Sequence, residues 1–172
     1  MRLPFLRKAA STGEPLVLAM TGARLGDAVV FVGSSPHLAL PLAARVGLSG
    51  RCVVAGPAAA TLEARATADG VLVEQAPDVP ADGSFDLAVV EAAGGWAGPA
   101  ARALRAVRPG GRIVVIAGAP RTDFLSRLTS APDPAAPAED IVVGLTDAGW
   151  LRARDIGQRD GLTFVEAFAH HA

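Results

Sequence analysis

The fold of this chain is decided by the stretch Gly26-Asp27-Ala28-Val29-Val30-Phe31-Val32-Gly33-Ser34-Ser35-Pro36-His37. Its apolar run at 28–32 is typical of a parallel strand that is buried on both faces and therefore shows no polar alternation. Gly33 is suited to a tight turn, and Pro36 is suited to the first position of a helix, where a missing backbone N–H costs nothing. The stretch therefore predicts a strand, a turn and a helix in direct succession.

Strand and helix patterns alternate along the rest of the chain, which predicts an α/β sheet with helices on both faces. Asp160-Gly161 lies in a loop of hairpin length, so the last two strands are expected to be antiparallel. Arg108-Pro109-Gly110-Gly111 predicts a tight turn before the fifth strand. The predicted helices cover residues 15–21, 36–46, 59–68, 96–107, 123–128 and 139–148, and the predicted strands cover 28–32, 51–55, 71–75, 85–91, 112–117, 151–156 and 162–168.

Length and composition indicate one globular domain. The chain has 172 residues, of which 51% are hydrophobic and 19% charged, so it can bury a core and is not typical of disordered or nucleic-acid-binding chains. We expect a basic, apolar N-terminal extension at 1–14 and a single domain at 15–172. Cys52 has no partner for an intrachain disulfide, and no apolar run approaches the roughly 18 residues of a membrane span. These features predict a cytoplasmic location.

The charges are segregated, although they sum to only −1. Seven acidic residues lie between 63 and 91 with one arginine, and six arginines lie between 102 and 127 with one aspartate. Two solvated faces are the simpler interpretation. The alternative is a docking surface for an acidic protein or for anionic lipid headgroups, because arginine pairs with carboxylates and phosphates in two-point geometry. Its candidate residues are Arg102, Arg105, Arg121 and Arg127, with the basic N-terminus at 2–8 as a second contact.

Four segments together resemble the class I S-adenosylmethionine-dependent methyltransferases, and they are Gly26–Gly33, Gly50–Val54, Asp82–Leu87 and Leu104–Val115. The last two are the more specific in their order and spacing, and the resemblance covers nearly the whole chain. It implies a Rossmann-like, doubly wound sheet of seven strands, mostly parallel, with a C-terminal antiparallel β-hairpin. It also implies an S-adenosylmethionine site at the carboxyl ends of the first strands.

The chain departs from this family at the positions that usually hold the cofactor. Family members carry an acidic residue late in the first strand, where this chain has Phe31. A second turn glycine of the family corresponds to Ser35, and the acidic residue that binds the ribose corresponds to Gly56. Asp78 is a displaced candidate for the acid near the adenine. The remnant crevice is therefore expected to consist of Gly33, Ser35, Gly56 and Asp78.

Candidates for catalysis are few. Glu91 ends the fourth predicted strand, at the edge where α/β folds place working groups. It is the best candidate for a general base, although an exposed loop carboxylate is the simpler interpretation. His37 lies beside the same crevice but has no Cys, Asp or Glu at ligand spacing, so no metal site is expected. Trp96 and Trp150 are expected to pack in the core or at its rim.

Three hypotheses from different classes follow. Each lost charge-assisted hydrogen bond weakens binding by roughly 1.5–3 kcal/mol. The first hypothesis is therefore a non-catalytic methyltransferase-like domain with no cofactor, which serves as an accessory or structural subunit of a larger protein assembly, including one on the cytoplasmic face of a membrane. The alternative is a compact methyltransferase that binds S-adenosylmethionine in a divergent pocket and uses Glu91 as its base. A binding protein for another nucleotide or small ligand is a third, weaker hypothesis, since the turn lacks phosphate-binding glycines. No nucleic-acid partner is expected.

Overall fold

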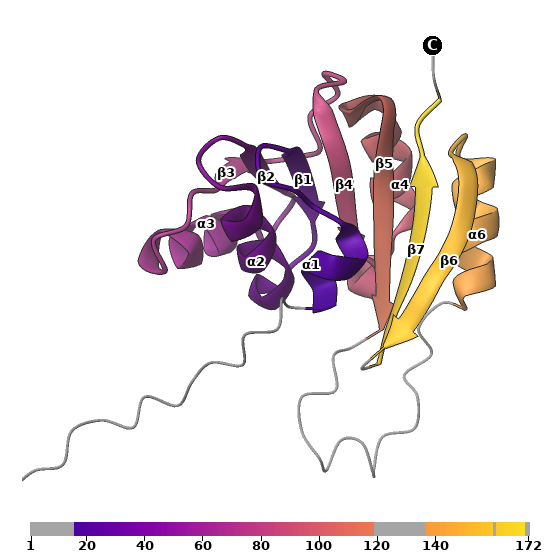
Figure 1. The fold of residues 1–172 in the computed structure, drawn as a ribbon, viewed down its shortest axis with the longest axis horizontal. Coiled ribbons are helices and arrows are strands. Elements are labelled where there is room, and N and C mark those ends of the chain that lie inside the picture. The colour runs from indigo at the N-terminus through magenta and orange to yellow at the C-terminus, as the bar shows by residue number, and fades with distance from the viewer. Residues whose placement is uncertain (1–15, 119–136, 160, 171–172) are drawn as a thin grey trace, which may run out of the picture.

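The computed structural model describes residues 16–118, 137–159 and 161–170. Helices and strands alternate through most of this part of the chain (Figure 1). The helices are α1 (Leu16–Thr21), α2 (Pro36–Val46), α3 (Ala59–Ala68), α4 (Ala97–Ala106) and α6 (Ala138–Asp147). The strands are β1 (Ala28–Val32), β2 (Arg51–Ala55), β3 (Glu74–Ala76), β4 (Phe85–Glu91), β5 (Val107–Gly118), β6 (Leu151–Arg159) and β7 (Leu162–Phe168), and a short 3-10 turn, η1 (Ala92–Gly94), follows β4.

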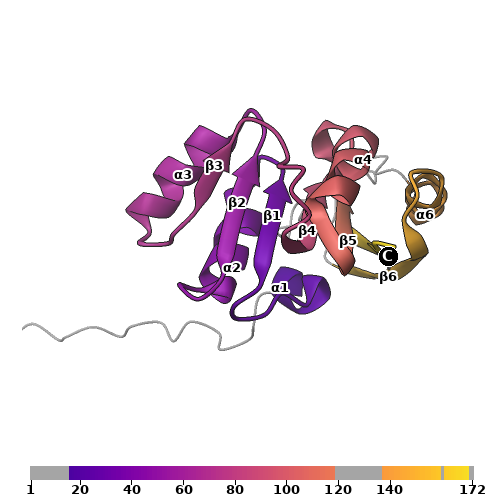
Figure 2. The same cartoon turned by 90° about the horizontal axis from the view of Figure 1, so that it is seen from above.

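The strands form one sheet in the order β3-β2-β1-β4-β5-β7-β6. The five strands from β3 to β5 are parallel, and β7 runs antiparallel to both β5 and β6. The chain winds outward from β1 to β3 and then crosses to the other side of β1 to form β4. The sheet therefore changes winding direction between β1 and β4, as in a doubly wound fold. Figure 2 shows α1 and α2 on one face of this sheet and α4 on the other.

The predicted architecture is confirmed, with differences in the bounds of several elements. The strand predicted at 151–156 extends to Arg159 as β6. The third strand was expected at 71–75, but only Glu74–Ala76 bonds to β2, while Val73 is buried in the core cluster that also contains residues of α3. The expected tight turn at 108–111 is a bulge within β5, because Phe85 pairs with Val107 and Leu87 already pairs with Arg112. The helix predicted at 96–107 covers Ala97–Ala106. The helix predicted at 123–128 lies outside the described residues.

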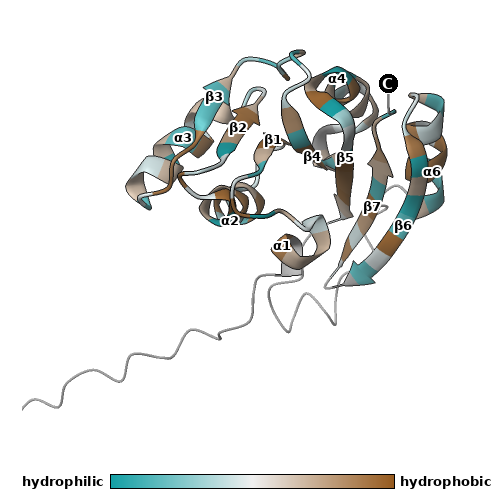
Figure 3. Cartoon of the chain, turned by 45° about the horizontal axis from the view of Figure 1, so that its top comes forward, coloured by the Kyte–Doolittle hydropathy of each residue, from teal (hydrophilic) through white to brown (hydrophobic). Residues whose placement is uncertain are grey.

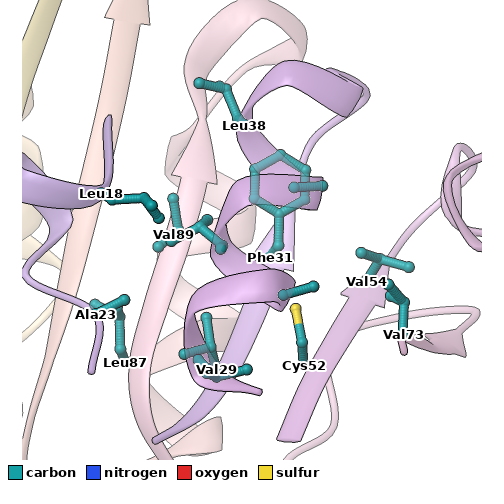
Figure 4. Packing of buried hydrophobic residues seen from close by; sticks show 14 of the residues in the cluster. Leu18, Ala23, Val29, Phe31, Leu38, Cys52, Val54, Val73, Leu87 and Val89 are labelled. Carbon is teal, nitrogen blue, oxygen red and sulfur yellow. The ribbon is translucent and has the colours of Figure 1, made fainter. Parts of the chain in front are cut away.

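Two hydrophobic cores lie on opposite faces of the sheet. The first packs β1, β2 and β4 against α1, α2 and α3, and Figure 4 shows Phe31 in this cluster with Leu38 of α2 nearby. The second packs the other face against α4 and α6, and α4 contributes three fully buried alanines, Ala100, Ala103 and Ala106. Trp150 is buried there and donates its indole N–H to the Ala100 carbonyl at 3.1 Å. In Figure 3 β5, inside the sheet, is coloured mostly hydrophobic, whereas β6 at the edge alternates.

The segments that carry the family resemblance tie distant parts of the sheet together. The Asp86 carboxylate accepts a hydrogen bond from the Ala28 N–H at 2.7 Å, and it also accepts one from Arg108 Nε at 2.5 Å. Arg112 Nη2 donates to the Gly22 carbonyl at 2.6 Å, which fixes the end of α1 to β5. These side chains therefore hold the fold and lie away from the carboxyl ends of β1 and β4.

Candidate functional site

The candidate site is the edge of the sheet where β1 and β4 end. In open α/β sheets, ligands bind outside the carboxyl ends of the strands at the point where the winding direction changes. Gly33 directly follows β1, and Glu91 is the last residue of β4. Because Val32 pairs with Val90 in the parallel ladder, Glu91 lies beside Gly33. The topology therefore brings together two residues that are 58 positions apart in the sequence.

The turn after β1 presents its backbone amides to a carboxylate. The N–H groups of Ser34 and Ser35 both donate to Glu91 Oε2, at 2.7 and 3.1 Å. Ser35 is the extended residue that precedes α2, and Pro36 occupies the first turn of that helix. Successive backbone N–H groups in a turn form a concave set of donors, which stabilises an anionic oxygen. The turn thus keeps an anion-binding geometry without further glycines.

Gly33 is required at this turn by space and not by backbone conformation. A Cβ on Gly33 would lie 2.6 Å from Glu91 Oε2, 2.7 Å from Glu91 Cβ and 2.8 Å from the Phe31 ring atom Cζ. Such separations are well inside van der Waals contact, so a side chain here would displace its neighbours. The missing side chain at Gly33 therefore admits the Glu91 carboxylate to the turn.

Glu91 differs from the expected exposed loop carboxylate. It is partly buried, it belongs to β4, and its Oε2 is bound to the turn. Among the described residues, its second oxygen, Oε1, has neither a hydrogen bond nor an ion pair with the protein. The sequence contained a signal for this arrangement, because a parallel β1–β4 pair with aligned ends places Glu91 next to Gly33. His37 is exposed on the first turn of α2.

The other remnant positions offer little to a cofactor. Phe31 is fully buried among apolar side chains. Gly56 has φ +104°, its N–H donates to the Ala76 carbonyl at 3.1 Å, and a Cβ there would meet nothing within 4 Å. The end of β2 is therefore open but lacks an acidic side chain. Asp78 Oδ1 lies 2.9 Å from Arg102 Nε and accepts a hydrogen bond from the Val79 N–H, so it is engaged with α4 and its own loop.

The candidate basic surface is only partly described. Arg102 lies at ion-pair distance from Asp78, although its Nε–H is not aimed at the carboxylate and makes no directed hydrogen bond. Arg105 is exposed on α4. Arg121 and Arg127 lie outside the described residues, so their convergence with α4 stays a prediction. Arg108 and Arg112, which contribute to the same run of positive charge, serve the structural contacts given above.

Other features of the described residues add no catalytic group. No cluster of three His, Cys, Asp or Glu side chains within them could hold a metal ion. None of the described helices has the length and apolar character of a membrane span. An open groove of about 680 Å³ lies between the start of α6 and β6, three strands away from β4 in the sheet. The site therefore consists of the turn at 33–35, Glu91 and the open end of β2.

Comparison with known proteins confirms the fold. No protein-family model matches the sequence, and no curated protein matches it either. A solved structure of a SAM-dependent methyltransferase from Aquifex aeolicus is similar with a TM-score of 0.68 at 18% identity, and the match covers 89% of this chain and 87% of that one. A SAM-dependent O-methyltransferase from Thermotoga maritima is similar with a TM-score of 0.65 at 14% identity. That match covers 92% of this chain but only 65% of the Thermotoga protein.

The same fold also occurs in a protein with another activity in its name. A precorrin 8W decarboxylase from Methanobacterium thermoautotrophicum is similar with a TM-score of 0.55 at 20% identity, covering 88% of this chain and 87% of that one. The chain thus has the class I methyltransferase fold. Identities this low show the fold alone, because one fold hosts different chemistries at its sites.

Proposed function

We propose that this chain is a compact methyltransferase-fold domain that binds S-adenosylmethionine at the β1–β4 edge. The observation that carries the proposal is the turn at 33–35, which holds the Glu91 carboxylate on two backbone amides at the switch point of the sheet. The SAM-dependent methyltransferases among the similar structures support the same cofactor.

The described residues fit the amino-acid end of this cofactor better than its ribose. Glu91 offers a carboxylate to a cationic group, and the turn at 33–35 lies against it. The open end of β2 at Gly56 leaves room for a ribose but supplies no carboxylate to its hydroxyls. When bound, S-adenosylmethionine supplies an electrophilic methyl group on a sulfonium centre. This chain's own residues contribute binding and orientation at that edge.

Glu91 is better placed for binding than for proton transfer. A general base needs one oxygen directed at the proton that it takes, and it usually needs a second group to orient it. The amides of Ser34 and Ser35 orient Glu91, but no described side chain lies in hydrogen-bond contact with Oε1 to pass the proton on. We therefore assign to Glu91 a role in ligand binding and not the role of a general base.

The small size of the domain does not argue against activity. The Aquifex methyltransferase matches this chain over 87% of its own length, so a protein of similar extent bears the name of a methyltransferase. This similarity supports the compact enzyme.

A non-catalytic accessory subunit is the second candidate function. It is favoured by the apolar Phe31, by the missing acid at Gly56 and by the engagement of Asp78 with Arg102. Its partner would be an acidic protein surface or an anionic membrane surface that meets Arg105 and the basic N-terminus. Arg105→Glu and deletion of residues 1–8 would each lower retention in a native complex at low salt under this candidate. Retention that is unchanged by both variants and by salt would count against it.

The deciding experiment is a titration of the whole chain with S-adenosylmethionine and with S-adenosylhomocysteine, followed by NMR. We expect saturable shifts at 33–35 and 91 with a Kd of about 100 μM or weaker, because anchoring hydrogen bonds are absent at Phe31 and Gly56. No shift at millimolar ligand would refute cofactor binding and leave the accessory subunit as the remaining candidate. If the chain does bind S-adenosylmethionine, transfer of its methyl group to a water-soluble acceptor would distinguish an enzyme from a subunit that only binds the cofactor.

A further inference from the structure

We infer that Glu91 recognises the α-ammonium group of the cofactor, and that β4 thereby supplies the carboxylate that the family resemblance places on β1. This inference rests on the proposed function, since it concerns how the same edge holds the amino-acid end of its ligand. It assigns to Glu91 the role of a specificity-determining residue and not that of a base.

β1 offers no carboxylate at this edge. The position expected to be acidic is Phe31, whose side chain is 0% exposed and packs in the core under α2. Phe31 pairs with Val89 in the β1–β4 ladder. Glu91 lies two residues further along β4, so the negative charge at the edge comes from the neighbouring strand and lies over the turn.

The Glu91 carboxylate is ordered by the protein before a ligand binds. Its Oε2 accepts hydrogen bonds from two backbone amides, and these fix the carboxylate over Gly33. A group that is ordered before the ligand arrives loses less conformational freedom on binding. Charge-assisted hydrogen bonds from a cation to such a carboxylate are stronger than neutral ones.

The Glu91 carboxylate lacks a cationic partner among the residues that the structure describes. Among the described residues, every ion pair joins other side chains, and Oε1 of Glu91 has no hydrogen bond. A partly buried carboxylate without a cation favours a ligand that brings one. The same arrangement occupies the Ser34 and Ser35 amides, so a ligand carboxylate would not find them free. Recognition of the amino-acid end is therefore through its ammonium group.

The test compares two ligands and three proteins. S-adenosylhomocysteine carries the α-ammonium group, whereas 5′-methylthioadenosine keeps the adenosine and the thioether and lacks the amino-acid end. The proteins are the wild type, Glu91→Gln and the control Glu139→Gln, which makes the same change at an exposed residue in the first turn of α6. Glutamine keeps one oxygen for the turn amides and replaces the other oxygen with an NH2 group, which cannot accept a hydrogen bond.

We expect Glu91→Gln to weaken S-adenosylhomocysteine binding about tenfold or more and to change methylthioadenosine binding less than about twofold. Glu139→Gln should change neither affinity. Unchanged or tighter S-adenosylhomocysteine binding by a folded Glu91→Gln protein would overturn the inference, and tighter binding would show that Glu91 blocks the site. If the wild type binds neither ligand, the proposed function fails. If it binds both and Glu91→Gln alters neither, only the ammonium contact fails.

A second comparison uses the wild type alone, so it is independent of the folding of any variant. An S-adenosylhomocysteine analogue with hydrogen in place of the α-amino group should bind about tenfold more weakly than the parent. Equal affinity for the two compounds would overturn the assignment of Glu91 to the ammonium group.

Discussion

The carboxylate of Asp86 binds the backbone N–H of Ala28 at 2.7 Å, and this contact joins the first residue of β1 to β4 across 58 positions of sequence. Arg108 Nε donates to the other oxygen of the same carboxylate. Asp86 thereby links three strands at the end of the sheet opposite to Glu91. Asp86 belongs to one of the segments that carry the resemblance, and its contacts stabilise the fold.

Replacing Asp86 should therefore cost stability without touching the ligand edge. Asp86→Ala leaves the Ala28 N–H and the Arg108 guanidinium without their acceptor, and we expect a loss of about 1–3 kcal/mol in the free energy of unfolding, measured by urea denaturation. Asp147→Ala, at an exposed residue near the end of α6, is the control and should change it by less than about 0.5 kcal/mol. A loss at Asp86 no larger than the control would show that the contact contributes nothing.

The stability of the protein should fall in alkaline solution because of one buried thiol. Burial raises the pKa of Cys52 from 9.0 to about 12, and the nearby Glu74 charge acts in the same direction. In the unfolded chain the thiol ionises near pH 9, whereas in the folded chain it stays protonated. The stabilisation is therefore complete below pH 9 and is lost as the pH rises towards 12.

This loss is measurable because few other groups titrate in the same range. The sequence has no tyrosine, and its one lysine is Lys8. Urea denaturation between pH 9 and 11 should show a fall of roughly 1.4 kcal/mol per pH unit in the wild type. Cys52→Ala should be less stable at neutral pH, because it leaves a cavity, but nearly flat across this range. If the free energy of unfolding falls equally steeply with pH in both proteins, the loss does not come from the Cys52 thiol.

Gly144 makes room for Trp96 between α6 and α4. A Cβ on Gly144 would overlap the far end of the Trp96 ring. Gly144→Ala gains about 1 kcal/mol of helix propensity, but we expect overpacking of about 1–3 kcal/mol to outweigh it. The midpoint of urea unfolding should therefore fall in Gly144→Ala and recover in part in Gly144→Ala/Trp96→Leu. A more stable single variant would show that the Trp96 ring moves aside freely.

Gly33→Ala should disturb both the turn and its carboxylate. The added methyl group would press on Glu91 and on the Phe31 ring, so we expect a loss of about 1–3 kcal/mol in stability and displaced NMR amide signals at Ser34 and Ser35. Gly98→Ala is the matched control. Gly98 lies in α4, and a Cβ there would meet Arg102 Nη1 at 3.5 Å, which is an ordinary contact distance. The control should gain helix stability. Unmoved Ser34 and Ser35 signals in Gly33→Ala would contradict the tight contact with Glu91.

Most of the fold could be predicted because local patterns determine it. A buried strand is the simple interpretation of the apolar run at 28–32. A β-hairpin is the simple interpretation of the loop that contains Asp160-Gly161. The bulge at 108–111 could not be found in this way. Proline and glycines at those positions favour a turn locally, and only the pairing of Phe85 with Val107 and of Leu87 with Arg112 shows that the strand continues through them.

The candidate site was predicted less well, since its main contact is not local. The sequence placed Gly33 and Glu91 at the same edge, but the bonds of Glu91 to Ser34 and Ser35 depend on the register between β1 and β4. Asp78 was a cofactor candidate because it closely follows the third predicted strand. In the fold it lies at ion-pair distance from Arg102 of α4, and its role towards a cofactor stays a prediction.

The strand order also affects how the chain emerges during synthesis. β1 ends at Val32, yet its second neighbour, β4, is complete only at Glu91, about 60 residues later. At typical translation rates of 5–20 residues per second, one edge of this apolar strand stays unpaired for roughly 3–12 seconds. Ribosome-bound chains that end before residue 85 should therefore be held by chaperones that recognise apolar segments. Chains extended far enough to release β4 and β5 from the ribosome should escape them.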